Sequence, residues 1–378
     1  MNPVERLIRE RIASGGPMTV ADYMSLALGH PEHGYYHAQE AIGAAGDFTT
    51  APEISQMFGE MIGLWAAVVW QQMGAPASLR LVELGPGRGT LMTDLLRAAE
   101  TVPDFAAALD IHFVETSPRL RAAQRAALPG RMAAWHDNLA SVPAGPTIIV
   151  ANEFFDALPV NQFIRQGNQW CERHVGLADD GNGGLEFVTG RAAGQGTLPA
   201  EIHELTAPDG AIIEDAPARA AAVREIADRL ATEDGGAALI IDYGHIVSAP
   251  GDTLQAVKDH APHSPLDEPG MADLTSHVDF AALARACAGT STTPHGPVEQ
   301  GRFLLGLGIE ARAATLLRNA PSQSARDVEQ ALTRLTGSDA MGSLFKVLAL
   351  TRKDAPVPPG FEGTTARRAG AVASAAGR

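Results

Sequence analysis

The sequence predicts a doubly wound α/β fold with a mostly parallel sheet, and three features of the chain lead to that prediction. Short apolar runs recur between residues 79 and 152 and alternate with stretches that have helical spacing. Such runs fit strands that helices cover on both faces of a sheet. A glycine-rich turn follows the first run, where this fold class binds ligands. The chain of 378 residues is long enough for this fold with large insertions.

The first part of the chain predicts helices. Residues 4–12 and 19–28 carry apolar side chains at helical spacing, on either side of a Gly-Gly-Pro break. A third helix is predicted to begin at Thr50, because Glu53 stands three residues later at the spacing of a capping box. We therefore predict an N-terminal helical region over residues 1–75.

The rest of the chain predicts the α/β domain, over residues 76–353. Period-two alternation broken by the turn DDGNGG indicates an inserted antiparallel hairpin at about 160–215. The tail, 354–378, is rich in Pro, Gly and Ala, and we expect it to be disordered. Strands are predicted at 79–84, 111–116, 132–136, 147–152, 237–244 and 343–353, and helices at 90–99, 118–127 and 217–232.

Composition excludes several classes of function. The formal net charge of −15 disfavours a nucleic acid partner, because such binding relies on Lys and Arg. Cys171 and Cys287 are too few for a disulfide scaffold or a thiolate zinc site, and the histidines show no metal-ligand spacing, so we predict no metal. No apolar run approaches the roughly 20 residues that span a bilayer. The N-terminus has no apolar signal region, which predicts a cytoplasmic protein without membrane insertion.

The glycine turn at 85–89 is compatible with several ligands. Glycine lets the backbone approach a ligand closely and turn without steric cost. The NAD fingerprint requires Gly or Ala where Thr90 stands and expects an acid about 20 residues further on, whereas Glu115 lies 30 residues after Gly85. A P-loop is excluded because no Gly-Lys-Ser/Thr follows. A turn without any ligand is the remaining alternative.

Glu83, two residues before the turn, favours a cationic ligand. Its carboxylate would repel a pyrophosphate and attract an ammonium or sulfonium group, and S-adenosylmethionine carries both. Glu115, at the end of the second strand, can accept both ribose hydroxyls, although a solvated carboxylate is the alternative. Asp137 and Asn138 would face the adenine or form a simple Asx turn. The residues that we expect to bind the donor are Thr50, Glu83, Gly85, Pro86, Gly87, Glu115, Thr116, Asp137, Asn138 and Asn152.

Polar residues after the fourth and fifth strands are the candidates for chemistry. Glu153 and Asp156 stand among apolar residues at the position that faces the reactive end of a bound donor. Carboxylates suit a guanidinium because bidentate pairing fixes one nitrogen, while capping of the following turn is the alternative role. We predict Glu153, Asp156 and Asp242 as catalytic residues and Asp47, Phe155, Tyr243 and His245 as substrate-binding residues.

Longer segments of the chain resemble the MidA-like S-adenosylmethionine-dependent methyltransferases. The first, fourth and last of these segments are not general methyltransferase features, so the resemblance is specific, and it spans roughly residues 20–352. The segments are GDFTTAPEISQMFGE (46–60), LVELGPGRGTLMTDLLR (81–97), FVETSP (113–118), NEFFDALPVNQF (152–163), IIDYGH (240–245) and ADLTSHVDF (272–280).

The resemblance implies a seven-strand methyltransferase fold with extra N-terminal helices and a sizeable insertion that shapes a cleft for a protein substrate. Loops at about 245–300 are expected to border this cleft. The resemblance also implies protein arginine methylation, since mitochondrial members are arginine methyltransferases that assist assembly of respiratory complex I, and a complex I subunit is the expected substrate. Residues 38–40 and Asp259 depart from the family pattern, which bears on the substrate rather than on the donor. An assembly chaperone that keeps the fold and a small-molecule methyltransferase are the alternative functions.

Overall fold

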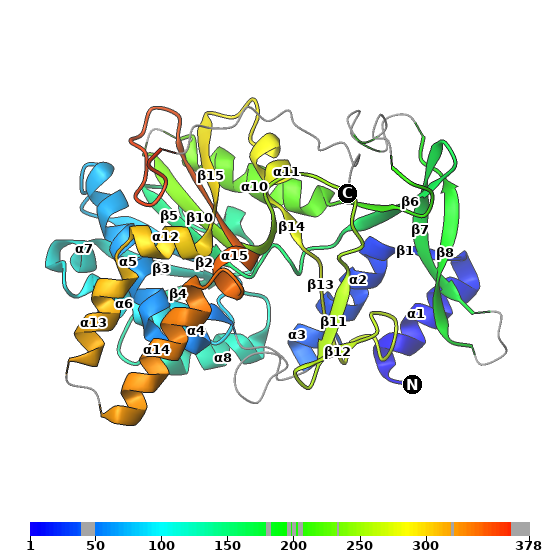
Figure 1. Cartoon of the computed structure of the whole chain (residues 1–378), viewed down its shortest axis with the longest axis horizontal. Helices are drawn as coiled ribbons and strands as arrows, with labels where there is room; N and C mark the ends of the chain where they lie inside the picture. The colour runs from blue at the N-terminus through cyan, green and yellow to red at the C-terminus, as the bar shows by residue number, and fades with distance from the viewer. Residues whose placement is uncertain are drawn as a thin grey trace.

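The computed structural model describes residues 1–38, 50–178, 183–194, 198, 202, 207–232, 234–318 and 321–363. Its centre is a sheet in which seven strands lie in the order β15-β16-β10-β5-β2-β3-β4, and a short eighth strand, β14, pairs with β10 (Figure 1). The bounds are β2 Leu79–Leu84, β3 Leu109–Val114, β4 Ala133–His136, β5 Thr147–Asn152, β10 Gly236–His245, β14 Val278–Asp279, β15 Thr292–Glu299 and β16 Phe345–Arg352.

Strand direction in this sheet confirms the predicted fold class. Strands β4, β3, β2, β5 and β10 are parallel to one another, and β16 runs antiparallel between β10 and β15. The chain goes from β2 to β3 on one side and returns to β5 on the other, so the order reverses beside β2. Open α/β sheets bind ligands outside the carboxyl ends of the strands at such a reversal.

The two faces of the sheet bury separate cores. In β5, Ile148 and Val150 pack into one core, whereas Ile149 and Ala151 pack into the other. This explains why the strand sequences are continuously apolar. The first core contains residues of α5 Gln56–Gln72, α6 Thr90–Ala99, α7 Pro103–Ala108, α12 Gln300–Gly306, α13 Ile309–Leu317, α14 Ser322–Thr336 and α15 Met341–Leu344, and the second contains residues of α10 Pro217–Leu230 and α11 Phe280–Ala286.

A second layer of structure lies beside the carboxyl ends of the strands, on the right in Figure 1. Helices α1 and α2 share one buried cluster with apolar residues of two smaller sheets. These elements place N-terminal residues next to the insertions. Their bounds are α1 Pro3–Gly15, α2 Val20–Gly29, α3 Tyr35–Ala38, β1 Met18–Thr19, β6 Asn161–Gln166, β7 Gln169–Leu177, β8 Leu185–Ala192, β9 Ile212–Asp215, β11 Gln255–Lys258, β12 Ala261–His263 and β13 Asp273–Thr275; helix α8, Pro118–Ala127, follows β3.

The helix predicted to begin at Thr50 differs from the prediction. It is divided at Ser55 into a short α4, Ala51–Ile54, and the long α5, whose N-cap is the Ser55 side chain. Thr50 makes no side-chain capping bond. Glu53 does not complete a capping box, because its Oε1 atom accepts the hydroxyl of Thr90 at 2.6 Å instead. The predicted capping box is therefore wrong, and Glu53 ties α4 to the start of α6.

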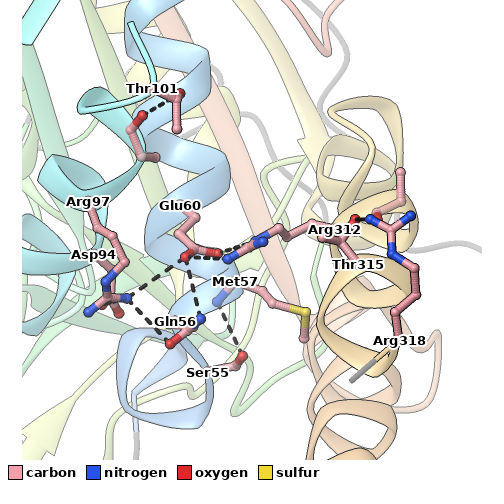
Figure 2. A network of polar contacts seen from close by, with 12 residues as sticks. Ser55, Gln56, Met57, Glu60, Asp94, Arg97, Thr101, Arg312, Thr315 and Arg318 are labelled. Atoms are coloured by element: carbon pink, nitrogen blue, oxygen red, sulfur yellow. Dashed lines mark hydrogen bonds and ion pairs between the residues drawn. The ribbon is translucent and has the colours of Figure 1, made fainter. Parts of the chain in front are cut away.

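A buried carboxylate joins three helices on the first face of the sheet (Figure 2). Glu60 of α5 is 4% exposed and accepts two hydrogen bonds from Arg312 of α13, at 2.7 and 2.9 Å. Arg97 of α6 lies 3.8 Å from the same carboxylate and pairs with Asp94 at 2.7 Å. This network fixes α6, which carries the glycine turn at its start, against α5.

The segment after β16 also differs from the prediction. Phe361 is fully buried and its ring lies 5.5 Å from that of Phe303, between ring centroids. Phe361 therefore packs on the first core instead of belonging to a disordered tail. The remainder of the predicted tail, 364–378, lies outside the described residues.

Candidate active site

Two adjoining cavities lie at the carboxyl ends of β2, β3 and β5. We call the smaller one, of about 50 Å³, the donor hollow and the larger one, of about 410 Å³, the main cavity. Thr50, Gly85, Gly87 and Glu153 line both, so the two cavities form one continuous site. The donor hollow is also lined by Pro52, Glu53, Glu83, Pro86, Arg88, Thr90, Leu91 and Asn152.

The glycine turn lies at the boundary of the two cavities. Gly85, Gly87 and Gly89 have φ angles of 59°, 53° and 85°, a region that favours glycine. A Cβ atom added at Gly85 would lie 2.9 Å from Cδ2 of Phe154, whose ring lines the main cavity. Gly85 and Gly87 line both cavities, so the backbone of the turn is accessible to a ligand there.

Buried acceptor atoms without hydrogen-bond partners line the donor hollow. Glu83 is 4% exposed, burial raises its pKa well above its usual range, and its Oε2 atom has no partner. Oδ1 of Asn152 is likewise buried and unpartnered. Unpaired buried acceptors are costly, so the hollow suits a ligand that donates hydrogen bonds and carries positive charge. The ammonium group of S-adenosylmethionine has both properties, and the residues present fit it.

Glu115 and Thr116 line the main cavity, as expected for residues that contact the donor. Glu115 is 9% exposed, and burial raises the pKa of its carboxyl group against the opposing effect of hydrogen bonds. Its two oxygens accept the backbone N–H of Ser117 at 2.7 Å and Nε2 of Gln124 at 3.2 Å. These bonds fix the carboxylate, and each oxygen keeps a second lone pair for a ribose hydroxyl.

Asp137 and Asn138 lie differently from the prediction. Asp137 is largely exposed and pairs with Arg121 at 2.6 Å. The side chain of Asn138 accepts the backbone N–H of Ser141 at 3.0 Å and caps a short 3-10 helix. Neither residue lines the donor hollow or the main cavity. The two cavities therefore give no support to the predicted adenine contacts, and the hydrogen bond of Asn138 fits the Asx-turn alternative.

Glu153 lies where the two cavities meet. It follows β5 with a φ of 50°, a strained conformation for a residue with a side chain, which is typical of functional sites. Its Oε1 atom accepts the backbone N–H of Ala51 and Nδ2 of Asn152, each at 3.2 Å. Burial, together with the charge of Asp156, raises the pKa of Glu153 to about 8. The carboxyl group can therefore exchange a proton near neutral pH.

Asp156 lines the main cavity from the same loop. It is 5% exposed, and its Oδ2 atom accepts the hydroxyl of Tyr243 at 2.9 Å. Burial raises the pKa of Asp156. Tyr243 lines neither cavity, so it supports Asp156 from behind instead of contacting a substrate there.

Asp242, predicted to be catalytic, is a structural residue. It is fully buried, and its Oδ2 atom accepts the backbone N–H groups of Phe155 and Asp156 at 3.0 and 3.1 Å. Its Oδ1 atom accepts the N–H of Tyr243 at 2.9 Å. The prediction was wrong because all of these bonds are made inside the protein, and Asp242 lines neither cavity.

The predicted substrate-binding residues are also displaced from the cavities. Phe155 is fully buried in the second core, and Phe154 lines the main cavity in its place. His245 lines a different cavity, of about 510 Å³, with its Nε2 atom 3.9 Å from Asp279. Asp47 and residues 39–40 lie outside the described residues. Asp259, the other departure from the family pattern, lies between β11 and β12 and lines neither cavity.

Sequence reasoning missed six polar residues that line the two cavities: Ser25, Tyr36, Glu53, Arg88, Thr90 and Asp273. Arg88 lines the donor hollow, and Tyr36 and Asp273 line the main cavity. Arg88 lies inside the predicted glycine turn, so the sequence could have identified it as a site residue. Tyr36 and Asp273 come from segments 237 residues apart, which no local pattern connects. In the described part of the chain, no group of three His, Cys, Asp or Glu residues is arranged to hold a metal ion.

Comparison with known proteins identifies the family. A family model described as a putative S-adenosyl-L-methionine-dependent methyltransferase matches residues 61–298. This chain belongs to that family. The predicted resemblance, the methyltransferase activity and the methyl donor are thereby confirmed. The unpartnered acceptors of the donor hollow, on Glu83 and Asn152, are compatible with the methionine end of this donor.

Relatives and a solved structure support the assignment over nearly the whole chain. A Drosophila melanogaster protein named protein arginine methyltransferase NDUFAF7 homolog, mitochondrial, is 39% identical over 91% of this chain and 83% of its own length. The Homo sapiens protein of that name is 36% identical over 92% of this chain and 84% of its own length. A likely methyl transferase from Burkholderia thailandensis, bound to S-adenosyl-homocysteine, aligns with a TM-score of 0.84 and 30% identity over 95% of this chain and 94% of its own.

The same relatives overturn the predicted cytoplasmic location. The proteins from fly, zebrafish and human are all named mitochondrial. The prediction depended on the composition of the first 16 residues, and compartment is not fixed by such a short segment. Among the described residues, no helix combines the length and apolar character that crossing a bilayer requires.

Proposed function

We propose that this methyltransferase acts on an arginine ω-nitrogen of a protein substrate. The observation that carries the proposal is that Glu153 and Asp156 both line the main cavity, together with Gly85 and Gly87 of the glycine turn. A guanidinium presents planar pairs of N–H donors that carboxylates bind bidentately. The names of relatives such as the fly and human proteins, protein arginine methyltransferase, agree with this acceptor.

Methyl transfer requires the protein to position the acceptor nitrogen and to remove one proton from it. When bound, S-adenosylmethionine supplies the methyl group. The acceptor nitrogen gains a bond to carbon and must lose one proton. Glu153 lines both cavities, and its pKa of about 8 suits a group that orients the guanidinium and takes up that proton near neutral pH. Asp156, held by Tyr243, would bind a second N–H pair of the acceptor.

A protein substrate is the class of partner that this function requires. The main cavity, of about 410 Å³, is of the size that admits a side chain rather than a folded domain. The substrate arginine must then be presented on an exposed segment. The family resemblance suggests that this protein substrate is a subunit of respiratory complex I.

Mass spectrometry of cells that lack the gene tests the proposal. We expect a methylarginine that is present in the parent strain, disappears from the deletion strain and returns with the wild-type gene. A gene carrying Glu153→Gln should not restore it, whereas Glu100→Gln, a change at an exposed ion pair with Arg131, should. A lost methyl-lysine, or a lost methylated small molecule, would refute the arginine proposal. Assembly of complex I restored by Glu153→Gln would favour the chaperone role.

A further inference from the structure

A third carboxyl group lines the main cavity together with Glu153 and Asp156. Asp273 belongs to β13, in the small sheet between β10 and α11, and is 8% exposed. Glu153 and Asp156 belong to the loop that follows β5. The acids therefore reach one cavity from two separate elements of the fold.

A tyrosine hydroxyl fixes the carboxylate of Asp273. Tyr36 of α3 donates its hydroxyl to Oδ1 of Asp273 at 2.9 Å, and Tyr36 itself lines the main cavity. The neighbouring Tyr35 is fully buried and its ring packs edge-on against Tyr36, with 5.3 Å between centroids. The phenol is thus held by the N-terminal layer, as expected for a residue that supports a binding group.

Electrostatics show that the three carboxyl groups interact. The charge of Asp273, like that of Asp156, contributes to the raised pKa of Glu153, after the larger effect of burial. Burial and then the charges of Asp273 and Asp156 raise the pKa of Tyr36 well above its usual range, so its hydroxyl remains a donor. Like charges in one partly buried cavity destabilise each other, and a bound cation relieves that repulsion.

We propose that Asp273 binds the acceptor guanidinium together with Glu153 and Asp156, and that Tyr36 is the positioning residue of Asp273. This inference rests on the proposed function. A guanidinium has five N–H donors spread over a plane and can reach carboxylates on separate elements, whereas a lysine ammonium presents three donors at one point. Asp273 is therefore the residue that makes the cavity prefer arginine over lysine.

Calorimetry with small probes tests this role in the full chain saturated with S-adenosylhomocysteine. The probes are N-acetyl-L-arginine methylamide and its lysine counterpart. We expect Asp273→Asn to weaken binding of the arginine probe by about 10-fold or more, because a charge-assisted hydrogen bond is lost, and to change lysine binding much less. Tyr36→Phe should lower the ratio of the arginine affinity to the lysine affinity by a smaller factor than Asp273→Asn does, because the carboxylate of Asp273 remains.

Controls separate this inference from the proposed function. Asp267→Asn removes an exposed acid from the same region that lines neither cavity, and it should leave both probes unaffected. Affinity for S-adenosylhomocysteine reports whether each variant is folded. If Asp273→Asn does not fold, the selectivity of Tyr36→Phe, which keeps every charge, tests the inference. Wild-type selectivity that persists in both variants would overturn the inference alone. Wild-type protein that binds no arginine probe would overturn the proposed function and the inference with it.

Discussion

Oδ2 of Asp242 accepts the backbone N–H of Asp156 at 3.1 Å, so the end of β10 holds the loop that follows β5. The same oxygen accepts the N–H of Phe155, and the other oxygen accepts that of Tyr243. Three backbone donors thus depend on one buried carboxylate. Asp242 thereby keeps the carboxyl group of Asp156 in the main cavity.

Asp242→Asn should therefore damage the loop without touching a ligand. The amide can accept the two N–H groups of the loop through its oxygen, but its NH₂ group then meets the N–H of Tyr243, and two donors face each other. We expect a loss of about 1–3 kcal/mol in the free energy of unfolding, the cost of an unsatisfied buried donor. Urea denaturation measures this loss. Unchanged stability with abolished turnover would contradict the structural role.

Glu83→Gln should weaken binding of the methyl donor. The carboxyl group has a buried oxygen without a partner in the donor hollow, and a bound ammonium favours its charged form against the burial that raises its pKa. We expect the Kd for S-adenosylhomocysteine to rise about 10- to 100-fold, because a charge-assisted hydrogen bond becomes a neutral one. Calorimetry measures the Kd, with the surface variant Glu100→Gln as the control. A Kd that stays within twofold of wild type would place the ammonium elsewhere.

Gly85→Ala should impair the site through both conformation and contact. The φ of 59° strains any residue with a side chain, and the new methyl group would lie 2.9 Å from the ring of Phe154. Gly130→Ala is a matched control, because Gly130 has a φ of 77° and nothing within 4 Å of an added Cβ atom. Both variants should lose about 1 kcal/mol of stability from backbone strain, but only Gly85→Ala should also lose donor affinity. Equal donor affinity in the two variants would contradict a close approach of the methyl donor to the backbone at Gly85.

Local patterns predicted six strands of the main sheet, namely β2, β3, β4, β5, β10 and β16, but not β15, and they indicated a ligand site at the turn after β2. Apolar runs locate β2 and β5 because both faces of each strand are buried, and Glu83 and Gly85 lie within a single strand-turn unit. Contacts between residues that are close in the chain can be predicted from local sequence patterns. The helix at Thr50 was predicted less well, because the bond from Thr90 to Glu53 replaces the local capping bond.

The acceptor end of the site depends on contacts that sequence spacing does not show. Phe154 and Phe155 are neighbours with the same side chain, and the strained turn at Glu153 decides which one lines the cavity. Asp242 and Asp273 are both acids in or beside strands, yet only Asp273 lines the cavity. Side-chain direction, set by packing of distant elements, separates a binding residue from a structural one.

The raised pKa of Glu153 predicts how stability changes with pH. Because its pKa in the folded protein is about 8, Glu153 holds this proton up to about pH 8, whereas the unfolded chain releases it near the ordinary pKa of 4.5. Between these values the folded state binds more protons than the unfolded state, so Glu153 lowers stability as pH rises. Below the unfolded value both states are protonated, and the effect vanishes.

Glu153→Gln keeps the residue neutral at every pH and isolates this effect. We expect the variant and the wild type to have similar unfolding free energies near pH 4.5, and the variant to be the more stable one above about pH 8. The difference should be on the order of 2–4 kcal/mol, because one pKa unit corresponds to about 1.4 kcal/mol and the half-buried carboxyl keeps part of its hydration. Denaturation at both pH values measures it. A difference that is constant with pH, or that grows as pH falls, would mean that the carboxyl group is not desolvated as the structure places it, and its role in proton removal would fail with it.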